Sequence, residues 1–421
     1  MSSELYQLLT APNGVTYNQP LGLFINNEWR QSRAEEFISV MSPIDENEIV
    51  KVHAGGEEDI DDAVKAARAA LKGISTTEKK FAYTTVGPIG VCGQIIPWNY
   101  PLGMAGWKIA PALAAGNCVI LKPAEQTLLS ILFFAEIIKK AGFPPGMINI
   151  VNGFGKRAGA ALAAHMDVDK IAFTGSTATG REVARLAARN LKEITIESGG
   201  KSPLLVFEDA DLDQAVKWSH YGIIANQGQI CTATSRILVH EKVYPQFIEL
   251  FKERVKSCKI GNPFDSDTFQ GPQVSKAQYE RVLSFIESGK AEGATVALGG
   301  QRTTVNGKGF YIEPTIFIDA SDDMQIYREE IFGPVAIISQ FKTEDEVGRR
   351  ANDTIYGLGA AIFTQDITRA HLLANEIEAG MVWINSSNDS DFRIPFGGVK
   401  QSGIGHRSSS AWYSKLSVTT L

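Results

Sequence analysis

Residues 170–180 read Lys-Ile-Ala-Phe-Thr-Gly-Ser-Thr-Ala-Thr-Gly, and this stretch indicates the fold class of the chain. Its first four residues form a short, mostly apolar run that is typical of a buried strand. The Gly, Ser and Thr residues that follow lead into a helical pattern over 180–188. Free backbone amides at the start of that helix could hold a pyrophosphate, although the same residues also make an ordinary helix cap. A strand that runs directly into a helix is the repeating unit of α/β proteins.

The same alternation continues on both sides of this stretch. Before it we expect a hairpin at 23–29, strands at 91–96, 118–121 and 148–151, and helices at 57–71, 102–115, 128–141 and 159–164. After it we expect strands at 236–239, 335–341, 360–364 and 381–384, and helices at 244–258, 344–351 and 367–378. Such alternation predicts parallel sheets covered on both faces. The sequence therefore predicts an α/β protein with a Rossmann-like domain at 1–78 and 87–200, a second α/β domain at 201–405, and small strands at 79–86 and 411–421.

Composition narrows the class of protein. The chain has 421 residues, too many for one hydrophobic core, and 44% of them are hydrophobic. Its 41 basic and 47 acidic residues give a net charge of −6, which argues against a nucleic-acid or membrane-surface partner. The most apolar long stretch, 103–121, contains Lys108, Pro111 and Asn117 and is a poor membrane span. Residues 1–22 lack the features of a signal peptide, so we expect a cytoplasmic protein.

Among the four cysteines, Cys231 differs from the others in its surroundings. Cys92 and Cys118 lie within apolar strands and Cys258 ends an amphipathic helix, which are typical positions for inert thiols. Cys231 instead follows Asn-Gln-Gly-Gln-Ile and precedes Thr-Ala-Thr-Ser. No CxxC spacing and no cluster with metal-ligand spacing occurs, so we expect a reducing compartment and no metal site.

A carboxylate and an amide complete a candidate catalytic set. Glu197 ends the apolar run 194–197, and a thiol with a carboxylate base is the minimum needed to form and then hydrolyse an acyl-enzyme. Asn99 lies between two prolines, and a rigid amide there could donate to an oxyanion together with the backbone N–H of Cys231. From the residues alone, an asparagine between prolines is more often a turn residue. None of the six histidines has a context that would suit a cysteine–histidine protease.

Two further segments carry candidate cofactor ligands. Lys122 and Glu125 follow the strand 118–121, and ligands of such sheets bind beyond the carboxyl ends of strands. An exposed ion pair would give the same pattern. Gly153-Phe-Gly155 with Gly159 forms GxGxxxG, which alone is weak evidence for a dinucleotide site.

Together these segments resemble the aldehyde dehydrogenase superfamily. The resemblance spans nearly the whole chain and lies in the segments 97–99, 173–177, 194–203, 226–231, 329–334 and 395–405. It implies a Cys231 nucleophile, a Glu197 base, an Asn99 oxyanion donor and a supporting Lys108. From the residues alone, Lys108 could equally be a lysine that buries its stem and extends its charge to solvent.

The resemblance also implies NAD as the cofactor. Glu125 would bind the adenosine ribose, where an acid opposes the 2′-phosphate of NADP. Glu330 would hold the nicotinamide ribose, and Phe332 would pack on the nicotinamide ring. The full set of implied cofactor-binding residues is Ile96, Trp98, Lys122, Glu125, Gly155, Ser176, Thr179, Glu330 and Phe332.

The chain departs from this family mainly in length. Relatives carry roughly eighty more residues, enough for several helices, just after Leu71. Smaller departures are one residue fewer between Gly180 and Glu197, Ser198 in place of a leucine, and an altered C-terminus from His406. Because a parallel sheet needs both faces covered, we expect the deletion to bare one face, open the substrate mouth and lower stability.

The expected reaction is oxidation of an aldehyde to a carboxylic acid with NAD. It would pass through a thiohemiacetal and a thioester on Cys231, and Glu197 would act as base in the hydrolysis. Two alternatives stay open, a weakly active or inactive NAD-binding remnant and a cofactor-independent thiol esterase. The resemblance also implies a homo-oligomer, dimer or tetramer, joined through strand 416–421. The sequence does not predict which aldehyde is used.

Overall fold

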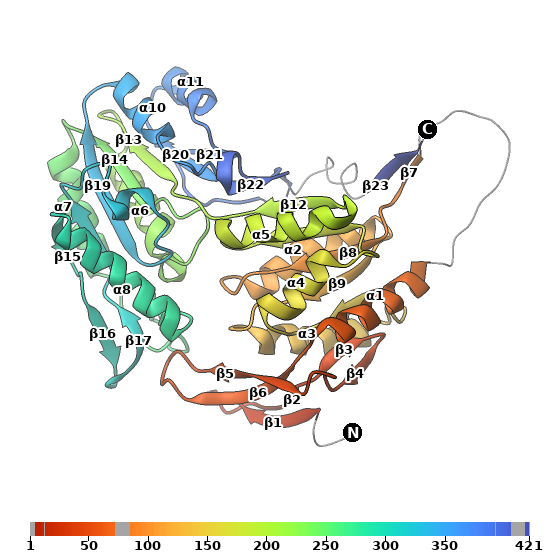
Figure 1. The fold of residues 1–421 in the computed structure, drawn as a ribbon. Coiled ribbons are helices and arrows are strands. Elements are labelled where there is room, and N and C mark those ends of the chain that lie inside the picture. Colours follow the sequence, from red (N-terminus) through yellow and green to blue (C-terminus); the bar gives the residue numbers. More distant parts are fainter. Residues whose placement is uncertain (1–4, 12, 72–84, 392, 406–416, 421) are drawn as a thin grey trace.

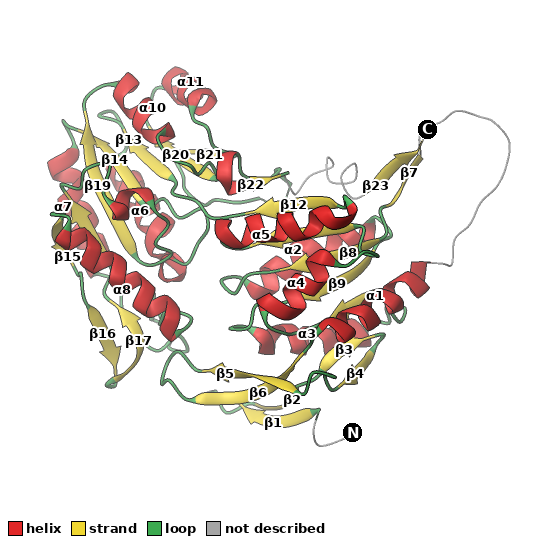
Figure 2. Ribbon diagram, viewed as in Figure 1, coloured by secondary structure: helices red, strands yellow, loops and turns green. Residues whose placement is uncertain are grey.

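The computed structural model describes residues 5–11, 13–71, 85–391, 393–405 and 417–420. Two large sheets, each with helices packed on it, lie side by side and contain most of the chain (Figure 1). Helices and strands alternate in both halves, as Figure 2 shows. The α/β class predicted from the sequence is confirmed.

The first sheet has eight strands in the order β22-β12-β11-β8-β9-β10-β3-β4. Its five central strands run parallel, and every residue of β8, β9 and β11 is buried, which explains their continuous apolar sequences. The edges are antiparallel, so the sheet is mixed where the sequence predicted a parallel sheet and a separate hairpin. The strands are β3 (Leu23–Ile25), β4 (Glu28–Arg30), β8 (Val91–Ile95), β9 (Cys118–Lys122), β10 (Ile148–Ile150), β11 (Lys170–Thr174), β12 (Glu193–Glu197) and β22 (Gly403–Ile404).

Helices cover both faces of this sheet. On one face α1 (Glu57–Leu71), α4 (Ala160–Ala164) and α5 (Thr177–Ala187) share a buried apolar cluster with the strands. On the other, α2 (Pro101–Ala114) and α3 (Leu128–Lys140) share a second cluster. Among the described residues, the prediction that the deletion bares a sheet face is therefore wrong, because α2 and α3 already bury that face. The segment 72–84, which includes most of the strand segment predicted at 79–86, lies outside the described residues.

Exposed apolar surface lies instead one layer further out, on α2. Leu102 is 52% exposed, and Gly103, Ala110 and Ala114 are exposed on the same side of the helix. The one charged residue in α2, Lys108, is buried. A helix without a polar outer face is normally covered by a neighbouring element.

The second sheet has the order β15-β18-β19-β14-β13-β20-β21, and all strands but β15 run parallel. Four of its strands match predicted ones, namely β14 (Arg236–His240), β19 (Val335–Phe341), β20 (Gly359–Phe363) and β21 (Met381–Ile384). The sequence did not indicate β13 (Pro203–Val206), β15 (Thr295–Leu298), β18 (Thr315–Ile318), α6 (Leu212–Ile224) or α8 (Lys276–Ala291). The predicted helices appear as α7 (Tyr244–Lys256), α10 (Glu344–Asn352) and α11 (Ile367–Glu376).

Smaller elements connect and extend the two sheets. β7 (Thr85–Pro88) and β23 (Ser417–Thr420) pair antiparallel and form a ribbon that extends away from the first sheet (Figure 1). These strands overlap the segments predicted at 79–86 and 411–421. No helix in the described part of the chain is both long and apolar enough to cross a bilayer.

Candidate active site

A cleft of about 440 Å³ lies between the two sheets, at the carboxyl ends of strands of the first sheet. The segment after β8 supplies Trp98 and Asn99 to its wall, and the turn from β11 into α5 supplies residues 174–178. The second half supplies Cys231, Glu330 and Phe332. Ligands of open α/β sheets bind at this edge. The cleft therefore brings together six predicted site residues, Trp98, Asn99, Ser176, Cys231, Glu330 and Phe332.

A tight turn positions Cys231. Asn226, Gln227 and Gly228 have φ values of 49°, 57° and 69°, so three consecutive residues lie in the left-handed region. A Cβ on Gly228 would lie 2.0 Å from the carbonyl oxygen of Gly333, so only glycine fits there. Such sparsely populated backbone conformations concentrate at functional sites. The turn leaves Cys231 half-buried in the wall of the cleft.

Asn99 is tied to this turn. Its Nδ2 donates to the carbonyl oxygen of Gln229 at 3.0 Å, and Asn226 Nδ2 donates to the carbonyl oxygen of Asn99 at 3.1 Å. A side-chain amide has two N–H donors, and the bond to Gln229 uses one of them. Asn99 therefore holds the cysteine turn in place while it retains a donor for a ligand in the cleft.

Glu197 ends β12 and is 2% exposed. Its Oε2 accepts a 3.0 Å hydrogen bond from the hydroxyl of Thr174, which lines the cleft. Its neighbour Ser198 is buried, and the Ser198 N–H donates to the carbonyl oxygen of Ser402 at 2.8 Å, in the segment that leads into β22. The carboxylate is thus held by the hydroxyl of a residue that lines the cleft.

Lys108 and Ile96 are the predicted residues that lie deeper. Both are buried, with 2% exposure, and the structure does not place either in the wall of the cleft. The carbonyl oxygen of Lys108 accepts from Gln94 Nε2 at 2.7 Å. Their assigned roles in catalysis and cofactor binding stay predictions.

Glu330 sits against a pair of glycines. Its Oε1 accepts from the Gly200 N–H at 3.0 Å, and a Cβ on Gly199 would lie 2.1 Å from Oε2. Burial raises the pKa of Glu330 to about 7. Beside it, Phe332 meets Trp98 edge to face, with ring centroids 5.2 Å apart. Residues from both halves of the molecule therefore form this end of the cleft.

Lys122, Glu125 and Gly155 form a second group beyond the ends of β9 and β10. Lys122 Nζ lies 3.2 Å from Glu125 Oε2, and the Gly155 N–H donates to Glu125 Oε1. The Lys122 side chain is only 3% exposed, so this is not the exposed ion pair considered as an alternative. Burial lowers the pKa of Lys122.

Ser176 serves as the N-cap of α5. Its Oγ accepts from the Thr179 N–H at 3.3 Å, and the two hydroxyl oxygens lie 2.9 Å apart. Ser176 also lines the cleft. The helix-cap interpretation is therefore confirmed, and the same residue is available to a ligand.

The other three cysteines lie in environments that favour the thiol. Cys92 and Cys118 are buried, and burial raises the pKa of Cys92 to about 12. Cys258 Sγ lies 3.0 Å from His220 Nε2, and burial lowers the pKa of His220 to about 4. A neutral His220 can accept a hydrogen bond from the Cys258 thiol, which keeps its proton. The described residues contain no group of three or more His, Cys, Asp or Glu side chains placed to hold a metal ion.

Comparison with known proteins identifies the family. The family model described as "Aldehyde dehydrogenase family" matches residues 29–80 and 72–420. The chain belongs to the aldehyde dehydrogenase family. An aldehyde dehydrogenase-like protein of Schizosaccharomyces pombe is 48% identical over 475 positions, which cover 96% of this chain and 95% of the relative. An aldehyde dehydrogenase of Aspergillus niger is 44% identical over 472 positions, which cover 96% of this chain and 95% of that relative.

Solved aldehyde dehydrogenases share the whole architecture. An NAD⁺ complex of the enzyme from Bacillus cereus matches with a TM-score of 0.90 at 39% identity and covers 95% of both chains. The betaine aldehyde dehydrogenase of Staphylococcus aureus in complex with NAD⁺ matches with a TM-score of 0.91 at 33% identity. The match covers 96% of this chain and 94% of the S. aureus chain. The sequence-based assignment to this family is confirmed.

The comparisons also locate the deletion. The aldehyde dehydrogenase family model matches this chain in two parts, and the two matched ranges overlap at residues 72–80. The alignment with the S. pombe relative extends over 475 positions, more than the 421 residues of this chain, so that relative has residues without a counterpart here. The junction follows α1 and precedes β7.

Four residues beside the aldehyde dehydrogenase cleft were not predicted from the sequence. Thr174 contacts the carboxylate of Glu197, and Arg281 and Tyr356 line the cleft. Lys201 is buried close to Glu330, and each charge affects the pKa of the other. Thr174 lies inside the matched segment 173–177, so it could have been found there. Arg281 lies on α8, a helix that was not predicted from the sequence. Its position at the cleft depends on contacts between distant segments of the chain.

Proposed function

We propose that this chain oxidises an aldehyde to a carboxylic acid with NAD as hydride acceptor, through a covalent intermediate on Cys231. The observation that carries the proposal is the shared cleft. Cys231 and Asn99 both line it, and its wall residue Thr174 donates a hydrogen bond to the carboxylate of Glu197. A nucleophile, an oxyanion donor and a base are the groups that acyl transfer needs.

The first step uses Cys231 and Asn99. The thiolate attacks the aldehyde carbon, and the carbonyl oxygen becomes the oxyanion of a thiohemiacetal. The remaining N–H of Asn99 and the backbone N–H of Cys231 stabilise that oxyanion, because donors already aimed at the developing charge need no reorganisation. The thiohemiacetal then loses its hydride and becomes a thioester on Cys231.

The second step uses Glu197. The carboxylate removes a proton from a water molecule, the water oxygen attacks the thioester carbon, and the Cys231 thiolate leaves as the carboxylic acid forms. Thr174 orients the carboxylate through its 3.0 Å hydrogen bond. Transfer of the acyl group to coenzyme A would not need this base, so Glu197 favours hydrolysis.

The cleft fits NAD, which supplies the hydride acceptor. Glu330 presents a carboxylate seated on Gly199 and Gly200, where a side chain on Gly199 would leave no room, and it suits a ribose hydroxyl. The cap of α5 at Ser176 offers backbone amides to a pyrophosphate. Glu125 is the acid expected on the adenosine ribose. Two solved relatives that match this chain were obtained with NAD⁺.

A spectrophotometric assay tests the proposal. Purified chain mixed with NAD and a panel of aldehydes should produce NADH, and Cys231→Ala should not. A chain that binds NAD without reducing it is the remnant considered as one alternative. Ester hydrolysis without cofactor, combined with no NADH production, would instead support the thiol esterase.

A further inference from the structure

Lys201 is a buried cation that the proposed mechanism does not use. Its residue is 1% exposed, and its Nζ has no hydrogen-bond partner within the described part of the chain. Arg236 Nε donates to the Lys201 carbonyl oxygen at 2.8 Å and fixes the backbone from β14. A buried ammonium without a bonded partner is costly, so an observed one calls for a role.

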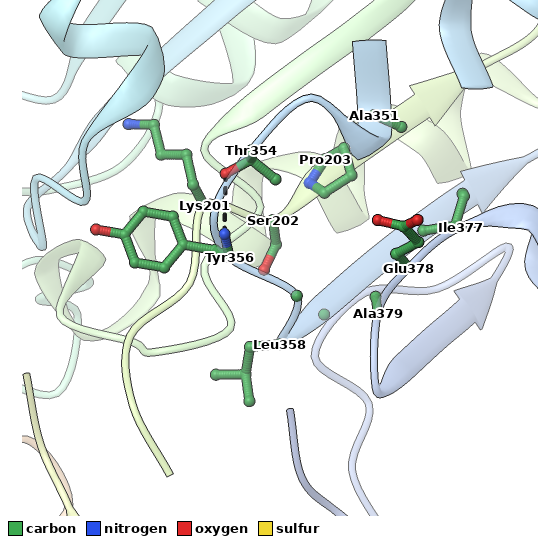
Figure 3. A pocket seen from close by; sticks show the side chains of 12 residues that line it. Lys201, Ser202, Pro203, Ala351, Thr354, Tyr356, Leu358, Ile377, Glu378 and Ala379 are labelled. Atoms are coloured by element: carbon green, nitrogen blue, oxygen red, sulfur yellow. Dashed lines mark hydrogen bonds between the residues drawn. The ribbon is translucent and has the colours of Figure 1, made fainter. Parts of the chain in front are cut away.

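Lys201 directly follows the two glycines that seat Glu330. The Gly200 N–H bonds to Glu330 Oε1, and Gly199 packs against Oε2, so the carboxylate is seated on the same short segment that carries Lys201. Lys201, Ser202 and Tyr356 are among the residues that line a cavity of about 10 Å³, which has room for about one water molecule. Figure 3 shows the Lys201 side chain pointing away from the Ser202 hydroxyl and to the same side as the Tyr356 ring.

The charges around Lys201 and Glu330 favour an interaction between these two residues. Burial and, to a smaller extent, the charge of Arg236 lower the pKa of Lys201 to about 7, and Glu330 and Glu329 oppose that shift. Burial raises the pKa of Glu330, and the Gly200 N–H, Lys201 and Arg281 oppose that shift. The ionisable groups on the surrounding elements are thus Arg236, Arg281, Glu329 and Tyr356.

We propose that Lys201 is a positioning residue for the cofactor, whose buried ammonium keeps the Glu330 carboxylate ionised on Gly199 and Gly200 so that it can accept from a ribose hydroxyl of NAD. This rests on the proposed function, because it needs Glu330 to contact NAD. Protonation of Glu330 removes the ionised acceptor, so NAD binding weakens as the pH falls through the pKa of Glu330. Without the lysine charge that pKa rises further, and the loss of binding begins at higher pH.

The test is the NAD dissociation constant, measured by titration calorimetry between pH 6 and 9, which does not depend on turnover. Lys201→Met should weaken NAD binding roughly fivefold near pH 7, because a rise of about one unit in the pKa of Glu330 lowers its ionised fraction from about a half to about a tenth. Binding should recover toward the wild-type value at high pH. Replacing a buried cation by an apolar side chain of similar volume should not lower the melting temperature.

Two further variants separate the possible outcomes. Ser202→Ala, at the neighbouring buried residue, should leave the pH profile of NAD binding unchanged. In a Glu330→Gln background, Lys201→Met should have no further effect on NAD binding, because it acts through that carboxylate. Additive effects, or an unshifted pH profile for Lys201→Met, would overturn the positioning role alone. Unchanged NAD binding in Glu330→Gln itself would overturn both this role and the assigned cofactor contact.

Discussion

The hydroxyl of Thr174 donates a 3.0 Å hydrogen bond to the carboxylate of Glu197, and both side chains are buried. The two residues end the neighbouring strands β11 and β12, where Thr174 pairs directly with Glu197. The register of the sheet therefore sets the distance between the orienting hydroxyl and the proposed base. This contact links the fold of the first sheet to the second step of the reaction.

Removing that hydroxyl should slow hydrolysis. Thr174→Val keeps the shape of the side chain but leaves the carboxylate without its 3.0 Å partner. We expect kcat to fall roughly tenfold, in line with the value of a hydrogen bond to a charged group. Steady-state kinetics measures this effect. Thr315→Val, at a buried threonine of β18 that also makes hydrogen bonds, should lower the melting temperature and leave kcat unchanged.

The four cysteines should respond differently to replacement by alanine. Cys231→Ala should abolish NADH production, since no other thiol lines the cleft among the described residues. Cys92→Ala, Cys118→Ala and Cys258→Ala should mainly lower the melting temperature, because these thiols are buried or bonded to His220. Turnover and melting curves for all four variants provide the comparison. Substantial turnover in Cys231→Ala would show that another group is the nucleophile.

Much of the fold could be predicted from local patterns. The apolar runs of β8, β9 and β11 are buried strands, and the 3.6-residue period of 57–71 is α1. The hairpin predicted at 23–29 is present as β3 and β4, but its place at the edge of the sheet was not predicted. The opposite edge was missed because β22 is only two residues long and its pairing with β12 is a contact between distant segments. The exposed surface of α2 was also missed. Its sequence is apolar on every side, which does not reveal which side faces the sheet.

The residues of the candidate site were likewise only partly predictable from local sequence. Cys231, Asn99, Glu330 and Phe332 stand in long, specific motifs, and the cleft contains all four. Local sequence did not indicate that Lys201 lies beside Glu330, which is far along the chain, nor that Arg281 reaches the cleft from α8. Burial and charge at these positions depend on the packing of the two halves.

Cofactor choice tests the role of Glu125. With this acid on the adenosine ribose, NAD should give a higher kcat/KM than NADP, because a 2′-phosphate would meet a carboxylate at close range. Glu125→Ala should reduce the ratio of kcat/KM with NAD to kcat/KM with NADP. Glu253→Ala, at an exposed acid on α7, should leave this ratio unchanged. A preference for NADP in the unaltered chain would contradict the assignment of Glu125.

The apolar outer face of α2 should make the chain prone to aggregate. Ala110→Glu places a charge on this exposed side, so it should reduce aggregation in size-exclusion chromatography without lowering the melting temperature. Ile109→Glu, at the adjacent buried residue, should unfold the protein. In the longer S. pombe relative, a glutamate at the position aligned with Ala110 should lower the melting temperature. A similar loss in this chain would mean that another surface, such as a second copy, already covers α2.

The proposed order of hydride transfer and hydrolysis is tested most sharply by the burst of NADH that Glu197→Gln forms in a stopped-flow experiment. Hydride transfer precedes hydrolysis in the proposed sequence, so this variant should still form about one NADH per Cys231 and then nearly stop. Steady-state turnover should fall by roughly 10²–10⁴, the usual contribution of a general base. Mass spectrometry should then find the acyl group on Cys231. Loss of the burst together with turnover would contradict the account, because Glu197 would then act before or during hydride transfer.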